Sequence, residues 1–263
     1  MKRANERAQH PTLRVRLLGA TQISYGDRRL DQYLTPRTLL LLAALVKHQG
    51  EPLSREQLAF TLWPDHNEDE ARANLRRHLY QLARVLPPQE APWVVSDAKT
   101  VSWPARHDAW ADVAEFERLS EANEPEAALA LYRGELLPRI DHEWVAAARA
   151  ALHGMACRHL ERAIVQRRER GDLTTCLEHV EHLLALDPWR EDMLRALMYL
   201  RFRKGDRAGA LAAYRDFCRR LRFEFDVDPM PQTERCHELI ARGQAALEEC
   251  FPGGAAAALG IGA

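Results

Sequence analysis

Hydrophobic and polar residues alternate near the start of the chain and then change to a helical spacing. Leu13, Val15 and Leu17 alternate with two arginines, which is the period of a strand with one buried face. Glycine-containing turns follow, so residues 13–35 are predicted to form a short antiparallel sheet. A helix is then predicted for 36–49, because it begins with proline and a glycine follows it.

Two more helices and a hairpin are predicted next. Ser54 and Gln57 form a capping box before an apolar run, so a second helix is predicted over roughly 54–63. A polar segment separates it from a third helix, predicted for 70–86, which two prolines end. Two short β-branched runs around a Ser-Asp-Ala-Lys turn then predict a hairpin over 93–103.

From about residue 110 the pattern is helical only, and it contains an internal repeat. The dipeptide Gly-Asp occurs at 171 and again at 205, 34 residues apart, and each copy precedes a helix with small residues inside it. That spacing is the tetratricopeptide period. We therefore predict a helical repeat domain over about 110–250, with a long helix over roughly 143–169.

Composition and charge narrow the class of protein. The chain is 46% hydrophobic and 29% charged, as globular proteins are, and its longest apolar run, 39–46, is too short to cross a membrane. The first residues lack a signal peptide's apolar segment, so a cytoplasmic protein is expected. Residues 1–110 hold 16 Lys and Arg against 12 Asp and Glu, whereas 111–263 hold 21 against 26. This asymmetry is consistent with a nucleic-acid-binding part joined to a part with another role.

The helix predicted for 70–86 has an apolar face and a face of hydrogen-bond donors. On a helical wheel the apolar arc has His78 at its edge and consists of Ala71, Leu75, Leu79, Leu82 and Leu86. The opposite arc carries Asn74, Arg76, Arg77, Tyr80, Gln81 and Arg84. Arginine reads guanine edges, asparagine and glutamine read adenine, and all of them bind phosphates. The alternative interpretation is a solvated helix surface.

The neighbouring elements favour DNA binding. A shorter helix precedes this one and a hairpin follows it, which is the order helix, turn, recognition helix and wing. Lys99 lies at the tip of the predicted wing, where it could reach a phosphate or a minor groove. The alternative for Lys99 is an ordinary exposed turn residue.

Specific stretches resemble a known family. The N-terminal stretches RVRLLGATQIS, TPRTLLLLAALVKHQGEPLSREQLAFTLWPD and ARANLRRHLYQLARVL resemble the Streptomyces antibiotic regulatory protein family, whose winged helix is similar to that of OmpR/PhoB-type response regulators. The second half, most specifically 186–229, resembles the bacterial transcriptional activator domain, a tetratricopeptide-like module. The resemblance covers roughly 12–247.

The resemblance implies a mainly α protein with a small β component. A winged helix-turn-helix DNA-binding domain is expected at 12–106, an α-helical tetratricopeptide-like domain at 110–250, and a flexible tail or linker at 251–263. It implies a bacterial transcription regulator, an activator, that binds promoter DNA and associates with the nucleoid. The expected partners are double-stranded promoter DNA, RNA polymerase, a second copy of the chain and a small anionic effector such as a nucleotide. No cofactor is expected.

Candidate DNA contacts follow from the third helix and the wing. The base contacts are assigned to Asn74, Arg76, Arg77 and Gln81. The phosphate or wing contacts are assigned to Arg37, Arg72, Tyr80, Arg84 and Lys99. The family often carries Arg-Leu-Arg where this chain has Gln-Leu-Ala at 81–83, so its phosphate affinity or preferred operator is expected to differ.

Two further groups of charged residues each have two interpretations. A surface that faces RNA polymerase is assigned to Asp65, Glu68 and Asp69, whereas the simpler interpretation is acids that favour the positive end of a helix. An effector site in the helical domain is assigned to Arg158, Arg162, Arg201 and Lys204, whereas arginine-rich helix faces are ordinarily solvated.

The sequence gives little support for a metal site, a disulfide or an enzyme active site. Cys176, His179 and His182 cannot all face one ion on a helix, so no metal site is predicted. The five cysteines include no Cys-x-x-Cys pair and are expected to be reduced. A phosphate-binding GxxxxGK loop and a nucleophile–base pair are both absent from the sequence, so an enzyme is not expected. The alternatives to a DNA-reading regulator are an effector sensor and a protein-interaction scaffold.

Overall fold

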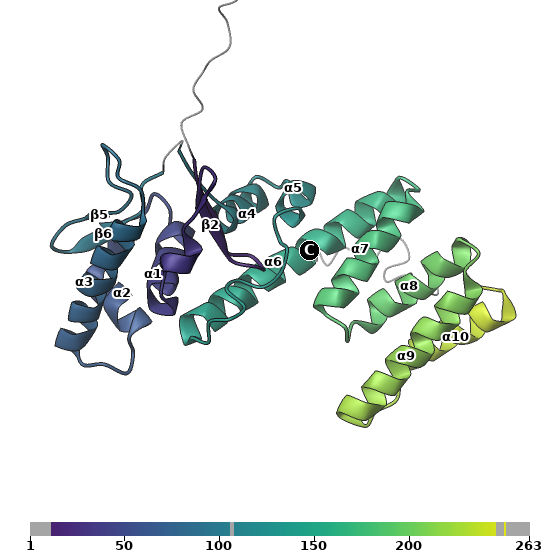
Figure 1. The fold of residues 1–263 in the computed structure, drawn as a ribbon. Helices are drawn as coiled ribbons and strands as arrows, with labels where there is room; N and C mark the ends of the chain where they lie inside the picture. Colours follow the sequence, from purple (N-terminus) through teal and green to yellow (C-terminus); the bar gives the residue numbers. More distant parts are fainter. Residues whose placement is uncertain (1–11, 106–107, 246–249, 251–263) are drawn as a thin grey trace, which may run out of the picture. The chain divides into compact units, whose positions relative to one another are not determined.

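The computed structural model describes residues 12–105, 108–245 and 250, and it contains two compact units, 1–156 and 157–263 (Figure 1). The predicted mainly α architecture with a small β component is confirmed. The predicted tail, 251–263, lies outside the described residues, and the domain limits 12–106 and 110–250 stay predictions.

A four-stranded sheet opens the first unit. Its strands are β1 (Leu13–Arg16), β2 (Gln22–Tyr25), β3 (Arg28–Arg29) and β7 (Ala109–Ala111), in the order β3-β2-β1-β7. The predicted antiparallel pairing is confirmed for β1 and β2, and Leu13, Val15 and Leu17 are buried as their alternation predicts. The sequence did not predict β7, which pairs with β1 in parallel.

Three helices follow, and a side chain caps the start of each. They are α1 (Pro36–Lys47), α2 (Arg55–Leu62) and α3 (Glu68–Val85). The capping oxygens belong to Thr35, Ser54 and Asn67, each of which accepts a hydrogen bond from the backbone N–H three residues later. Because Asn67 caps α3, that helix begins at Glu68, two residues before the predicted start.

The predicted hairpin is confirmed and forms part of a second sheet. Its strands are β5 (Val95–Ser96) and β6 (Thr100–Ser102), and β4 (Leu53–Ser54) pairs with β6 on the other side. The carboxylate of Asp97 holds the turn by accepting hydrogen bonds from the backbone N–H groups of Lys99 and Thr100, both at 2.7 Å. The hairpin is therefore a short, well-defined wing that begins ten residues after α3.

The rest of the first unit contains α4 (Asp112–Glu121), α5 (Pro125–Leu129) and the beginning of the long helix α6 (Glu143–Glu169). The buried carboxylate of Asp112, at the start of α4, accepts hydrogen bonds from the backbone N–H groups of Leu17 and Leu18. This contact fixes the end of β1 to the segment that follows β7.

The described residues of the second unit contain the end of α6 and the helices α7 (Leu173–Leu186), α8 (Glu191–Arg203), α9 (Arg207–Phe225) and α10 (Pro231–Arg242). The predicted repeat is confirmed. Gly171 and Gly205 have φ values of 72° and 85°, a left-handed conformation that glycine adopts readily at the end of a helix. The aspartate after each glycine then caps α7 or α9. Packing between α7, α8 and α9 gives α8 a largely buried surface.

Candidate nucleic-acid interface

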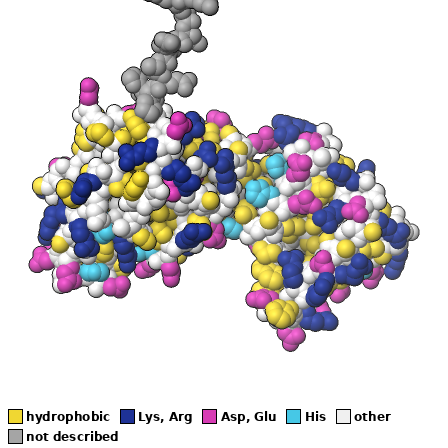
Figure 2. Space-filling view, viewed as in Figure 1, with side chains coloured by type: hydrophobic (Ala, Val, Ile, Leu, Met, Phe, Trp, Pro, Cys, Tyr) yellow, Lys and Arg dark blue, Asp and Glu magenta, His cyan; other side chains and the backbone are white. Residues whose placement is uncertain are grey.

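The third helix, α3, has one buried face and one face of exposed donors. Lys and Arg side chains gather over this helix in Figure 2. After its acidic first turn, the exposed positions on α3 are Arg72, Ala73, Arg76, Arg77, Tyr80, Ala83 and Arg84. Tyr80 is 65% exposed, and the guanidinium carbon of Arg84 lies 5.9 Å from the centre of its ring. The predicted donor face is therefore available to a ligand along most of the helix.

The buried face differs from the predicted one at two positions. His78, predicted at the edge of the apolar arc, is only 5% exposed, whereas Leu79 is half-buried. The ring of His78 stacks on Trp63, with centroids 5.4 Å apart, and its Nδ1 lies 2.9 Å from the hydroxyl of Thr38 on α1. Burial, together with Arg77 and Arg37, lowers the pKa of His78. A neutral histidine therefore fixes α3 against α1 and α2.

Three of the four predicted base-reading residues form hydrogen bonds within the protein, Gln81 with Thr38 and Asn74 with Arg77. The Thr38 hydroxyl donates to Oε1 of Gln81 at 3.1 Å, so that amide oxygen is directed towards α1. The half-buried Asn74 accepts a hydrogen bond from Nη2 of Arg77 at 2.8 Å, which orients that guanidinium. Arg76 and Arg77 are the two members of the set that are exposed.

A cavity of about 510 Å³ lies between the start of α2, the first half of α3 and the wing. Four cationic side chains line it against one acid, Glu56; they are Arg55, Arg72, Arg76 and Lys99. Arg72 forms ion pairs with Glu68 and, at 4.0 Å, with Glu56. In the part of the chain that the structure describes, the side chains of Arg76 and Lys99 form no ion pair. The groove therefore presents positive charge beside the exposed face of α3.

Arg55 belongs to this groove, and the sequence reasoning missed it. Its backbone N–H donates to the carbonyl of Lys99 at 2.9 Å, and its guanidinium donates to the hydroxyl of Ser96. These bonds join the start of α2 to β5 and to the turn of the wing. A signal existed in the sequence, because an arginine directly after a helix cap stands at the positive end of the helix dipole, where cations are unfavourable.

The remaining predicted residues of the first unit lie around α3. Arg37 donates from Nη1 to the carbonyl of Leu62 at 3.3 Å. The three acids assigned to a polymerase-facing surface are all exposed, but only Asp65 lies in the connection between helices. Glu68 and Asp69 belong to the first turn of α3, where acids stabilise a helix start. The predicted loop over 64–70 is thus shorter than expected.

The proposed effector residues do not share one site. Arg201 lies on α8 and Lys204 directly follows that helix, and they contact Glu181 and Thr174 of α7 at 2.8 Å and 3.4 Å. Arg158 and Arg162 are exposed on α6, and neither belongs to the cavity that Arg201 lines. The structure therefore separates the predicted set into two pairs.

A winged helix followed by paired helices defines a class of transcription regulators, and comparisons with known proteins agree. Residues 31–101 match the family described as "Transcriptional regulatory protein, C terminal", and 106–241 match "Bacterial transcriptional activator domain". Because the second match covers more than half of the chain, this protein belongs to the bacterial transcriptional activator domain family. The predicted resemblance to the Streptomyces antibiotic regulatory protein family is confirmed.

The chain is similar to two proteins named regulatory protein AfsR. It is 26% identical to that of Streptomyces coelicolor over 258 residues and 25% identical to that of Streptomyces griseus over 243 residues. These matches cover 93% and 88% of this chain but 26% and 24% of the relatives, so the chain spans about a quarter of their length. The relatives are named regulatory proteins, in agreement with the prediction of a regulator.

A solved structure shares the fold. Mycobacterium tuberculosis EmbR, determined in complex with a low affinity phosphopeptide, aligns with a TM-score of 0.62 and 20% sequence identity. The alignment covers 90% of this chain and 66% of the EmbR chain. None of the helices in the described residues is long and apolar enough to cross a bilayer.

Proposed function

We propose that this protein binds promoter DNA sequence-specifically through α3 and activates transcription. The observation that carries the proposal is the exposed donor face of α3 beside the cationic groove formed with α2 and the wing. An α-helix fits the major groove of B-DNA, and a wing beside it reaches the backbone or the neighbouring minor groove. Recognition helices of this type need about three side chains at base edges.

The exposed side chains of α3 and its neighbours are assigned different roles in DNA binding. Arg76 and Arg77 are the proposed base-reading residues, because both guanidinium groups are exposed and can bind a guanine edge in bidentate fashion. Asn74 supports Arg77 by accepting its hydrogen bond. Gln81 offers a base chiefly its amide nitrogen, since one acceptor position of its oxygen is engaged by Thr38. We assign the phosphate contacts to Arg37, Arg55, Arg72, Tyr80, Arg84 and Lys99.

Further partners follow from the family and from exposed charge. We propose that RNA polymerase contacts the exposed acids Asp65 and Asp69 next to the recognition helix, whereas Glu68 is engaged by Arg72. We also propose that the protein acts as a homodimer. Winged-helix and helix-turn-helix dimers read two half-sites about one helical turn apart, so the dimer predicts a repeated operator.

Effector control of DNA binding is a second candidate function. The observation that favours it is that two arginines four residues apart on α6, Arg158 and Arg162, are exposed. A small anion such as a nucleotide would bind the folded protein and raise its midpoint of thermal unfolding. Thermal unfolding in the presence of a panel of nucleotides tests this function, and an unchanged midpoint with every nucleotide would exclude it.

The experiment that tests DNA reading is selection of tight binders from a random duplex pool. The selected duplex is then titrated against a scrambled one at two salt concentrations, because phosphate contacts weaken with salt for any sequence. We expect an enriched motif with two copies about one helical turn apart. A pool without enrichment, bound only through a salt-dependent contact, would refute sequence-specific recognition by α3.

A further inference from the structure

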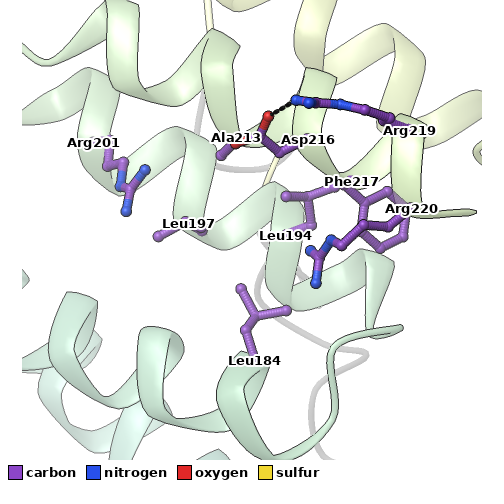
Figure 3. Close-up of a pocket in the computed structure, with 9 residues that line it drawn as sticks. All are labelled: Leu184, Leu194, Leu197, Arg201, Ala213, Asp216, Phe217, Arg219 and Arg220. Atoms are coloured by element: carbon purple, nitrogen blue, oxygen red, sulfur yellow. Dashed lines mark hydrogen bonds and ion pairs between the residues drawn. The ribbon is translucent and has the colours of Figure 1, made fainter.

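The second unit contains an open cavity of about 540 Å³ between α7, α8 and α9. Its lining is apolar at the base, which consists of Leu184, Leu194, Leu197, Ala213 and Phe217 (Figure 3). Phe217 is fully buried, so this surface is continuous with the packed core of the unit. An apolar base on a well-packed core provides a preformed site for an apolar group.

Three arginines surround this base, and their surroundings differ. Arg201 lies 2.8 Å from Glu181, and Arg219 is bound to Asp216, as Figure 3 shows. Arg220 forms neither a hydrogen bond nor an ion pair within the described residues, and its guanidinium carbon lies 6.0 Å from the ring centre of Trp189. The cavity therefore combines an apolar base with one guanidinium that forms no ion pair among the described residues, although Asp216 also lines the cavity.

An exposed aromatic pair adjoins Arg220. Trp189 is 37% exposed and Phe225 is 53% exposed, and their rings meet edge to face with centroids 4.7 Å apart. Exposed apolar groups rimmed by charge mark surfaces that bind other molecules, and tryptophan and arginine are frequent among residues that dominate binding energy. Arg220 joins this pair to the cavity, because it lines the cavity and faces Trp189.

We propose that this surface binds an acidic amphipathic helix of a partner protein. One apolar side chain of the partner occupies the base formed by the leucines and Phe217, and a carboxylate about one turn away binds the guanidinium of Arg220. Planar guanidinium and carboxylate groups form strong paired hydrogen bonds, which gives the site its preference for acidic partners. The proposal concerns the second unit alone and does not depend on DNA binding.

The open form of the cavity favours a helix over a small molecule. Sites for small molecules usually enclose most of the ligand surface, whereas this cavity is open along one side between its helices. An amphipathic helix needs only such a groove, because its polar face remains in solvent. The exposed Trp189 and Phe225 extend the apolar surface beyond the cavity, which suits a ligand longer than one side chain.

Fluorescence anisotropy with designed peptides tests the proposal on the full chain. The probe is a fluorescein-labelled helical peptide with leucines at i, i+3, i+4 and i+7 and glutamates between them. One control peptide replaces the glutamates with lysines, and another replaces the leucines with asparagines. We expect saturable binding of the acidic leucine peptide and at least about tenfold weaker binding of both controls.

Matched variants locate the site. Arg220→Glu should weaken binding of the acidic peptide at least about tenfold, because it replaces the attractive charge with a repulsive one. Leu184→Gln, at a half-buried position of the base, should also weaken binding. Arg242→Glu is the control, because Arg242 is an exposed arginine of α10 outside the cavity. Circular dichroism establishes that each variant is folded.

Three outcomes would overturn the proposal. The acidic peptide could fail to bind at about 1 mM, it could bind equally well after Arg220→Glu, or the lysine peptide could bind as tightly. Sedimentation velocity of the same variants measures self-association and so tests whether a second copy of the chain occupies this surface. If Arg220→Glu abolishes self-association while the peptide does not bind, the surface is an interface between two copies of this chain.

Discussion

Asp112 is the residue whose loss should most clearly weaken the first unit. Its side chain is buried, and its two carboxylate oxygens lie 2.8 and 3.0 Å from the backbone nitrogen of Leu17. The second oxygen also accepts the backbone N–H of Leu18 at 3.0 Å. Asp112→Ala removes both oxygens and leaves two buried N–H groups without this acceptor.

The magnitude follows from these two donors. A buried N–H without an acceptor costs about 1–3 kcal/mol, so two of them cost about 2–6 kcal/mol. The carboxylate is buried, and this burial raises the pKa of Asp112 and makes its charge costly, a penalty that alanine relieves. We therefore expect a net loss of about 2–4 kcal/mol in the free energy of unfolding. At roughly 2–4 °C per kcal/mol for a chain of this size, the midpoint should fall by about 5–15 °C.

Thermal unfolding and urea titration, both followed by circular dichroism, measure this loss. Asp112→Asn keeps one carbonyl oxygen but places an amide donor against an N–H. Its midpoint of thermal unfolding should therefore lie between those of the alanine variant and the wild type. Glu115→Ala removes a carboxylate from an ion pair on the exposed side of α4 and should leave the midpoint nearly unchanged. An alanine variant of Asp112 that unfolds at the wild-type midpoint would refute the reasoning.

Two further predictions concern α3. Arg77→Ala should lose about 1–3 kcal/mol of binding free energy on the selected operator and should prefer it less strongly over scrambled duplex, as measured by electrophoretic mobility shifts. The control Arg118→Ala should bind as wild type does. Equal affinities for wild type and Arg77→Ala would contradict the assignment. Because the pKa of His78 is lowered in the folded protein, the unfolded chain binds more protons, so stability should fall as pH drops below about 6.5. His78→Gln should flatten that part of a urea-derived stability profile, and an unaltered slope would count against a neutral buried His78.

The elements with local signals could be predicted from the sequence. The capped starts of α2, α7 and α9 and the turn of the wing each depend on residues within a few positions of one another. The start of α3 could also have been predicted, since Asn67 before three acids is a helix-start signal. The polar character of that segment instead suggested a loop.

Features that depend on contacts between distant segments could not be predicted. A helical wheel places His78 at an edge, but only Trp63 and Thr38, on other elements, decide that the edge is buried. In the same way, the orientation of Gln81 depends on α1, and the cationic groove depends on how the wing meets α2. The donor face of α3 was predictable because it follows from the helix alone.

The parallel pairing of β7 with β1 also determines where this protein can be divided. β7 lies after residue 106, where the match to the activator domain begins. It nevertheless belongs to the four-stranded sheet with the N-terminal strands β1, β2 and β3. A fragment ending before β7 would leave the edge of β1 open to pairing with other molecules and would lose Asp112 as well. Recombination that exchanged the DNA-binding domain between regulators would therefore have to include β7. The two family regions cannot be separated at residue 106 without breaking this sheet.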